Sequence, residues 1–378
     1  MTNKELFYFL GKCLGLGENE ENDKTVINTI RRNKVDWNRF VVMASDHLVL
    51  PSVYLRFKRH DILPHLPKEL SDHLQTVYEL NFRRNTKLLE QINRINQALA
   101  AGGIIPIYLK GAGNLLDDLY EDIGERMMGD IDLLVSDAQF LPAAYLLKEN
   151  GYENKVPFFE DGIIVKHFPR MLNPNEPAAV EVHRVPVDTN LADHLNYGIV
   201  NAKRKSVEKG SPCFVLSDGH KVVLNFLHGF MANDVRLMHM VMYRNMVDFL
   251  LLSRRVDVYE VLARRRQYAS KAFVYADYIF QTMGISSDYP IGLRSKLFIL
   301  RHDLLMTSKF IFRLSWLLKY LFSRIWSGYV RNTFGILFSK RIRRSVFRRL
   351  NDPTWYKYHV KSYSSSFQAN FHGIKDLS

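Results

Sequence analysis

Two acidic residues open a short apolar run in GDIDLLV, residues 129–135. The run has the length and alternation of a β-strand, whose side chains point by turns to opposite faces. Asp130 and Asp132 then share one face and stand about 6.6 Å apart along the strand, at ~3.3 Å per residue. Two carboxylates this close repel each other and resist burial, so a nearby cation gives the pair a physical reason to exist. The alternative is that Asp130 caps a turn and Asp132 is solvated at the strand end.

A third carboxylate, Glu181, stands in a second alternating run, AVEVHRV at residues 179–185. Valines alternate with the polar residues, so Glu181 and His183 share a face. If this strand lies beside the first, Glu181 completes a site for two divalent cations about 3.5–4 Å apart and accepts a proton from an attacking hydroxyl. By itself the run also fits the exposed polar face of an edge strand. Together with the two aspartates, it favours a metal site.

The middle of the chain alternates short strands with helices. Helical patterns follow the first two strand-length apolar runs, and the four runs occupy residues 104–109, 130–135, 162–168 and 179–185. This order predicts an α+β fold with a small mixed sheet.

Helical patterns flank this core on both sides. Upstream, Leu88, Ile92, Ile95 and Leu99 recur at helical spacing before two glycines. Downstream, Ser217 is a typical helix cap before a long helical stretch. The predicted regions are an N-terminal helical region at 1–100, the strand-containing core at 101–215, a helical domain at 216–290 and a basic, aromatic-rich helical region at 291–378.

A strand-to-helix turn at Lys110 and Gly111 precedes the acidic strand. Free backbone N–H groups and a lysine at such a turn are suited to hold a triphosphate, and glycine allows close approach. Arg126, in the loop before Asp130, is a second candidate phosphate partner. An ordinary helix start with a surface lysine and a solvated arginine are the alternatives.

The net charge of +13 is unevenly distributed, because residues 301–350 hold twelve Lys or Arg and the single acid Asp303. Charges recur too often there for an apolar membrane span. One interpretation is a helical pair that packs its apolar stripe on the protein and shows its cations to water. The others are contact with an anionic membrane, nucleic acid or an acidic partner.

Two distant cysteines, Cys13 and Cys213, form no CxxC pair, so neither a disulfide framework nor a cysteine-rich zinc site is expected. The N-terminal residues lack the long apolar core of a secretory signal. We therefore expect a cytoplasmic protein, with the inner face of the membrane as a peripheral location if the basic segment binds lipid.

Four motifs in order carry a family resemblance: LKGAGNLL at 109–116, ERMMGDIDLLV at 125–135, VEVHR at 180–184 and RNMVDFLLL at 244–252. Together they resemble the uncharacterised bacterial nucleotidyltransferases of the DNA polymerase β superfamily, over roughly half to two-thirds of the chain. The resemblance implies a polymerase β-like nucleotidyltransferase core flanked by helical regions.

The resemblance also implies roles for individual residues. Asp130 and Asp132 would bind two Mg²⁺ ions, with Mn²⁺ as the alternative metal, and Glu181 would supply the third carboxylate. Lys110 and Gly111 would face the nucleotide. Where the wider superfamily carries Gly-Ser at this turn, this chain carries Lys110-Gly111.

The remaining candidates are less specific. His183 would stand behind the metal ligands and, with Arg126, complete the nucleotide-binding set. Arg244 and Asp248, one helical turn apart, would lie near the cleft, although a plain ion pair between them is the favoured explanation of the spacing. His228, beside apolar residues, also fits a core or surface histidine.

The leading hypothesis is transfer of a nucleoside monophosphate from a nucleoside triphosphate to an acceptor hydroxyl, with release of pyrophosphate. The acceptor, whether sugar, small molecule, RNA or protein, stays open. The alternative is a catalytically inactive nucleotide- or partner-binding protein that acts through its basic C-terminal region.

Overall fold

The computed structural model describes residues 1–158, 165–207, 213–231, 242–264, 267–286 and 290–307, with a few single residues beyond. Met1–Asn154 and Lys166–Thr307 form one compact unit, and the rest of the chain forms a second. Most of the predicted basic segment 301–350, and residues 162–164 of the predicted strand 162–168, lie outside the described residues.

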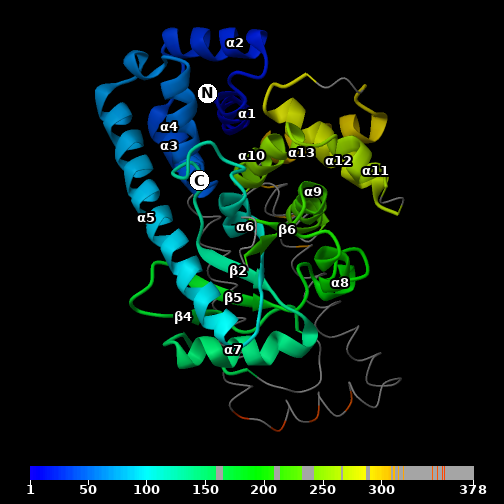
Figure 1. Cartoon of the computed structure of the whole chain (residues 1–378). Helices are drawn as coiled ribbons and strands as arrows, with labels where there is room; N and C mark the ends of the chain where they lie inside the picture. The colour runs from blue at the N-terminus through cyan, green and yellow to red at the C-terminus, as the bar shows by residue number, and fades with distance from the viewer. Residues whose placement is uncertain are drawn as a thin grey trace. The chain divides into compact units, whose positions relative to one another are not determined.

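The described residues form an α+β fold, as predicted. Figure 1 shows helices gathered above a sheet, with one long helix running beside it. The α-helices are α1 Asn3–Leu14, α2 Glu20–Arg31, α3 Trp37–Asp46, α4 Leu50–Arg59, α5 Lys68–Ala101, α6 Lys110–Leu116, α7 Phe140–Glu149, α8 Tyr197–Asn201, α9 Asp218–Phe226, α10 Met242–Ser253, α11 Val258–Ala263, α12 Ala269–Thr282 and α13 Leu293–Thr307. Short 3₁₀ turns η1 to η3 lie at Leu63–His65, Asp137–Gln139 and Thr189–Leu191, and a π-helical turn, η4, at Leu227–Met231.

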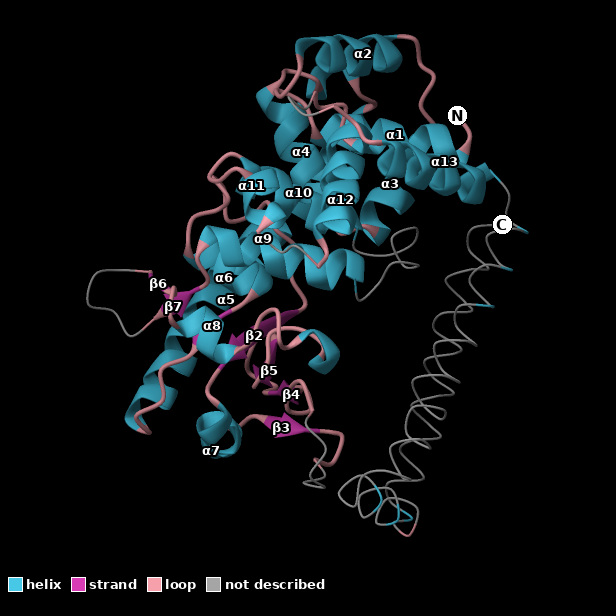
Figure 2. Ribbon diagram, turned by 90° about the vertical axis from the view of Figure 1, so that its right-hand side faces the viewer, coloured by secondary structure: helices cyan, strands magenta, loops and turns pink. Residues whose placement is uncertain are grey.

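A seven-stranded mixed sheet has the order β3-β4-β5-β2-β1-β7-β6. Its two longest strands, β2 and β5, lie side by side (Figure 2) and pair in parallel. β1 is antiparallel to β2 and parallel to β7, and the outer pairs are antiparallel. The strands are β1 Ile107–Tyr108, β2 Asp130–Leu134, β3 Glu153–Asn154, β4 Met171–Leu172, β5 Ala179–His183, β6 Lys205–Ser206 and β7 Phe214–Val215.

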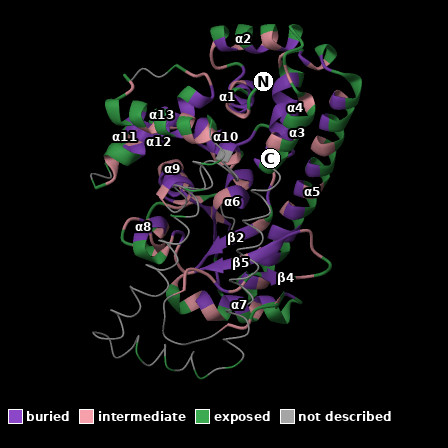
Figure 3. Cartoon of the chain, turned by 180° about the vertical axis from the view of Figure 1, so that it is seen from behind, coloured by how far each residue is buried: buried purple, intermediate pink, exposed green. Residues whose placement is uncertain are grey.

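The register of β2 on β5 sets the geometry of the acidic residues. Asp132 pairs with Glu181, and Asp130 with Ala179. The alternating apolar residues Ile131 and Leu133 are completely buried, and Figure 3 shows β2 and β5 as mostly buried strands. Because paired residues of parallel strands point to the same face, the aspartates and Glu181 share the face opposite these apolar side chains.

The predicted elements differ from the structure mainly where strands are short. β1 keeps two of its six predicted residues, and β3, β6 and β7 contain two residues each, too few for a period of two to be recognised. In the predicted strand 162–168, His167 makes only an isolated antiparallel bridge with His183. The helix after β1 begins at Lys110 itself.

Helix α5 holds the loop that leads into β2. This 34-residue helix ends before Gly102, as predicted. Its buried face carries amides that donate to loop carbonyls: Asn81 Nδ2 to Gly124 O at 2.7 Å and Asn85 Nδ2 to Arg126 O at 2.8 Å. Arg84 Nη1 donates to Met128 O at 2.5 Å. The backbone entering the acidic strand is therefore fixed by α5, since buried carbonyls lose free energy if left unpaired.

Helices α9 to α13 form the downstream helical part. Ser217 caps α9, as predicted, by accepting from His220 N. Farther on, α12 and α13 pack together through polar contacts within an aromatic core. Tyr278 Oη lies 2.8 Å from His302 Nε2, and Ser295 Oγ donates to Asp277 at 2.5 Å.

Acid should destabilise the fold partly through His302. Its side chain is 2% exposed, and burial, opposed by nearby Asp303, lowers the pKa of His302 to about 4. The unfolded chain therefore binds this proton at higher pH than the folded protein, so stability is lost as pH falls from about 6.5 towards 4. We expect the free energy of unfolding of the wild type to fall by about 2 kcal/mol more between pH 7 and pH 5 than that of His302→Gln. Urea titrations of both proteins at the two pH values measure this difference; equal losses would contradict it.

Candidate active site

The carboxylate of Asp132 is the buried centre of the site. It is 3% exposed, and its Oδ1 lies 2.5 Å from Lys110 Nζ and 2.8 Å from His183 Nε2. Burial alone raises a carboxyl pKa, but the charge of Lys110 and the contact with His183 outweigh it and hold the pKa of Asp132 far below its usual range. Asp132 is thus a fixed negative charge.

Glu181 and His183 approach Asp132 from β5. Glu181 Oε2 lies 3.5 Å from His183 Nε2, and one ligand atom from each of Asp132, Glu181 and His183 lies within 4.8 Å of the others. Burial opposes ionisation of Glu181, but the contact with His183 lowers its pKa. These three side chains therefore form a compact set of two oxygen donors and one nitrogen donor.

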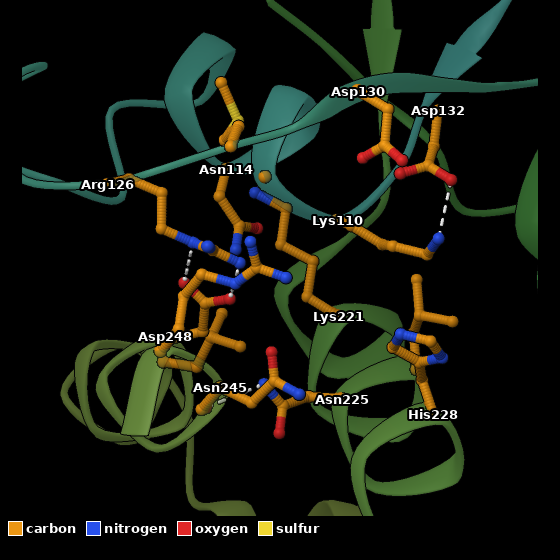
Figure 4. A pocket seen from close by; sticks show the side chains of 15 residues that line it. Lys110, Asn114, Arg126, Asp130, Asp132, Lys221, Asn225, His228, Asn245 and Asp248 are labelled. Carbon is orange, nitrogen blue, oxygen red and sulfur yellow. Dashed lines mark hydrogen bonds and ion pairs between the residues drawn. The ribbon is translucent and has the colours of Figure 1, made fainter. Parts of the chain in front are cut away.

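Asp130 stands at the edge of this set. It is half-buried, and burial together with the negative charge of Asp132 raises its pKa. Asp130 and Asp132 both line one pocket, and Figure 4 shows their carboxylates side by side within it. The predicted shared face of the two aspartates is present, whereas Glu181 and His183 lie behind Asp132 and do not line the pocket.

Lys110 and Gly111 are the first two residues of α6, directly after β1 and Leu109. Leu109 N donates to Asp132 O at 2.9 Å, which ties the turn to the acidic strand. Lys110 has a left-handed backbone with φ of 47°, a strained conformation for a residue with a side chain. At Gly111 a Cβ atom would lie 2.4 Å from Met128 Sδ, so here the glycine makes room for a neighbouring side chain.

The pocket lies between the sheet and the downstream helices. It encloses about 600 Å³ when the open solvent at its mouth is counted. The sheet side contributes the acidic pair and Lys110, and Figure 4 shows the opposite wall built from helices. Polar residues of that wall are Lys221, Asn225, His228, Arg244, Asn245 and Asp248.

A buried ion pair joins the two walls. Arg126 binds Asp248 through two hydrogen bonds, Nε to Oδ1 at 2.9 Å and Nη2 to Oδ2 at 2.7 Å, and Tyr120 Oη donates to the same carboxylate. Figure 4 shows the pair beside the pocket. Arg244 and Asp248 both line the pocket, as the resemblance implied. The ion pair between them, the other explanation of their spacing, is not formed: Arg126 is the ionic partner of Asp248, and Arg244 Nη1 donates to Met127 O at 3.2 Å.

Two further cations of the helical wall are only partly neutralised. The Nε atom of Arg244 is buried and has no hydrogen-bond partner in the described part of the chain. Burial, with the nearby positive charge of Arg126, lowers the pKa of Arg244 to about 10. Lys221 Nζ lies 2.5 Å from Asp117 Oδ2, and burial lowers its pKa despite this partner. Four cations and three acids line the pocket, and Arg244, whose buried Nε atom lacks a hydrogen-bond partner among the described residues, is suited to contact an anionic ligand.

A sequence model of the family described as uncharacterised nucleotidyltransferase matches residues 33–278, more than half of the chain. The chain belongs to this family. No curated protein and no solved structure gives a significant match. Membership supports a role in nucleotidyl transfer and a nucleotide substrate. Every pocket-lining residue falls within the range shared with this nucleotidyltransferase family, and α13 lies outside it.

Several pocket residues of this nucleotidyltransferase carry no recognisable signal in the sequence. Asn114 is 4% exposed within α6, and Lys221 is 5% exposed within α9. Each looks like an ordinary helical residue in the sequence, because only tertiary packing reveals that it faces the pocket. A lysine at a buried position of an apolar helix is the one usable hint, since lysine is almost never fully buried unless it is paired.

Proposed function

We propose that this chain is a metal-dependent nucleotidyltransferase with a polymerase β-like core, which transfers a nucleoside monophosphate to an acceptor hydroxyl. The register that pairs Asp132 with Glu181 supports the proposal most directly. It sets two carboxylates beside each other, with Asp130 on the same face, next to a pocket that both cations and carboxylates line. Family membership supports the reaction class.

The donor atoms fit a hard divalent cation. Asp130, Asp132 and Glu181 offer carboxylate oxygens, the ligands that Mg²⁺ and Mn²⁺ prefer. Burial and the neighbouring carboxylate raise the pKa of Asp130, so a cation bound beside it would stabilise its ionised form. We therefore propose these three residues as the metal ligands. Bound there, the metal would supply charge stabilisation for the attacking and leaving oxygens.

Lys110, Arg244 and Lys221 are the proposed phosphate-binding groups. Lys110 reaches Asp132 from the sheet side, and the other two stand in the helical wall. Arg126, also a predicted phosphate partner, has its Nε and Nη2 engaged by Asp248, so we propose that it positions this wall. His183 is fully buried and is proposed to orient Asp132 and Glu181.

The transfer is an in-line displacement at the α-phosphorus. A new bond forms between the acceptor oxygen and phosphorus, the bond between phosphorus and the α–β bridging oxygen breaks, and pyrophosphate leaves with that electron pair. Glu181 is half-buried and lies outside the pocket lining. We propose that Glu181, which is held ionised by His183, receives the proton of an acceptor hydroxyl that approaches from its side of Asp132. The remaining side chains hold the reactants in position.

The proposal is tested by incubating the purified full chain with Mg²⁺, each labelled nucleoside triphosphate and a panel of sugars, small molecules, RNA and proteins. Pyrophosphate release and label transfer for at least one combination are expected. If no combination releases pyrophosphate and equilibrium dialysis detects no triphosphate binding, the proposed function is wrong.

Lys110→Met should lower kcat/KM at least 100-fold, because the variant lacks the cation that stands between the acidic strand and the bound phosphates. Lys110→Arg should retain part of the activity, since arginine keeps the positive charge but carries it on a planar guanidinium group instead of a compact ammonium group. Pyrophosphate release measures the effect. Lys203→Met, at an exposed position, is the matched control and should behave as the wild type. Full activity in Lys110→Met would remove this residue from the site.

One observation favours a second function. Asp132 already accepts from both Lys110 and His183, so the carboxylate is satisfied without a metal. A catalytically inactive nucleotide- or partner-binding protein would keep this arrangement. The double variant Asp130→Ala, Asp132→Ala separates the two functions in cells: an enzyme loses its cellular function, whereas a binding protein retains it.

A further inference from the structure

The outer face of α13 exposes a stripe of leucines. Leu293, Leu297, Leu300 and Leu304 are 73%, 56%, 56% and 55% exposed. Their spacing of four, three and four residues places them on one side of the helix. Isolated exposed leucines are common, but a continuous apolar row on a protein surface indicates a contact site.

The orientation of this stripe is fixed by the opposite face of α13. Ser295, Ile299 and His302 are buried there, and the contacts of Ser295 and His302 with α12 are hydrogen bonds within a packed interior. Lys4 of α1 forms an ion pair with Asp303 at 2.7 Å. The helix is therefore held on two sides while its leucines face outward.

Cations stand on both sides of the leucine stripe. At about 100° per residue, Arg294 and Arg301 lie on one flank. Lys296 lies on the other, beside Asp303, whose charge is paired with Lys4. All three flanking cations are exposed. A leucine row between two positive flanks is the pattern of a helix that lies in a lipid–water interface, with its apolar side chains among the acyl chains and its cations at anionic headgroups.

We propose that the outer face of α13 docks on an anionic phospholipid surface. The positive flanks and the apolar row complement the two layers of such a surface, headgroup and hydrocarbon. The sequence after α13 is also basic and aromatic. Residues 308–350 contain eleven Lys or Arg and no acid, and they include Trp316 and Trp326. Tryptophan is enriched at membrane interfaces. The contact does not depend on the proposed catalysis.

No described helix is long and apolar enough to cross a membrane. The proposed contact needs none, because a helix that lies along the interface buries only one face.

A second copy of the chain fits this face less well. The spacing matches a coiled-coil seam, but it covers about two heptads, fewer than the three or four expected of a coiled coil. The positions flanking the seam hold Arg294, Lys296 and Arg301, and Asp303 is already paired with Lys4. Two such helices would bring like charges together across the seam, which weakens pairing.

Vesicle flotation with the full chain tests the proposal. The vesicles are pure phosphatidylcholine, or phosphatidylcholine with one third phosphatidylglycerol, at low and at high salt. We expect at least tenfold more protein on the anionic vesicles, and weaker binding at high salt. The variants Leu297→Gln/Leu300→Gln and Arg294→Gln/Lys296→Gln/Arg301→Gln should each lower binding at least tenfold.

The matched control is Val42→Gln/Leu80→Gln, which changes two exposed apolar residues on α3 and α5 and should bind as the wild type does. Thermal melting by circular dichroism confirms that the variants fold. The charge variant, which alters no apolar residue, decides the question if the leucine variant unfolds. Three results overturn the proposal: no flotation of the wild type, unchanged flotation of both α13 variants, or a wild-type dimer that the leucine variant converts to a monomer.

Discussion

Asp132→Asn is expected to lower kcat/KM for pyrophosphate release by at least 1,000-fold, which corresponds to about 4 kcal/mol of transition-state stabilisation. The substitution keeps the size of the side chain and removes the charge at the buried centre of the site. Loss of that charge removes a proposed metal ligand and also the counter-charge that Lys110 contacts at 2.5 Å. Pyrophosphate release under saturating Mg²⁺ measures the loss.

The matched control is Asp193→Asn, at an exposed position, which should retain wild-type activity. Urea unfolding of Asp132→Asn shows whether the variant is still folded. If it is, the lower kcat/KM reflects the changed side chain and not unfolding of the protein. A folded Asp132→Asn protein with more than a tenth of wild-type activity would falsify the assignment of this carboxylate to the metal site.

Asp248→Ala is expected to lower the free energy of unfolding by about 3–5 kcal/mol, the cost typical of breaking a buried ion pair on one side. Arg126 is 4% exposed, and without Asp248 its guanidinium keeps a buried charge that has lost its ionic partner. Tyr120 loses its acceptor at the same time. Urea titration followed by fluorescence measures the change.

The double variant Arg126→Met, Asp248→Leu is the companion experiment. When both charges are removed, Arg126 no longer leaves an uncompensated charge in the interior. The free energy of unfolding should therefore fall much less in the double variant than in Asp248→Ala. Additive losses in the double-mutant cycle would show that the two side chains do not stabilise each other. Activity of the double variant tells whether the pair is also needed to shape the pocket.

Local pattern was sufficient to predict the acidic strand. Alternation over a few residues predicted that Asp130 and Asp132 share a face, and the same period predicted that Glu181 and His183 do. The structure adds what no local pattern contains, the register that sets Asp132 beside Glu181. The catalytic and metal-binding roles of these residues stay predictions.

The helical wall of the pocket was beyond prediction from periodicity. Arg126 and Asp248 are 122 positions apart, and the nearer candidate, Arg244 at helical spacing, was the wrong partner. Asn81 and Asn85 are buried in α5. From the sequence alone, a polar side chain in a helix is expected to face solvent, and only the structure shows the backbone carbonyls that these two amides bind. Each of these contacts depends on the whole fold.

The ion pair of Arg126 with Asp248 spans the two sides of the pocket before any ligand arrives. Because a buried ion pair is costly to break, the distance between the two walls is constrained at this point. Any closure of the pocket around a ligand that moves these walls relative to each other would therefore have to rearrange the contact between Arg126 and Asp248.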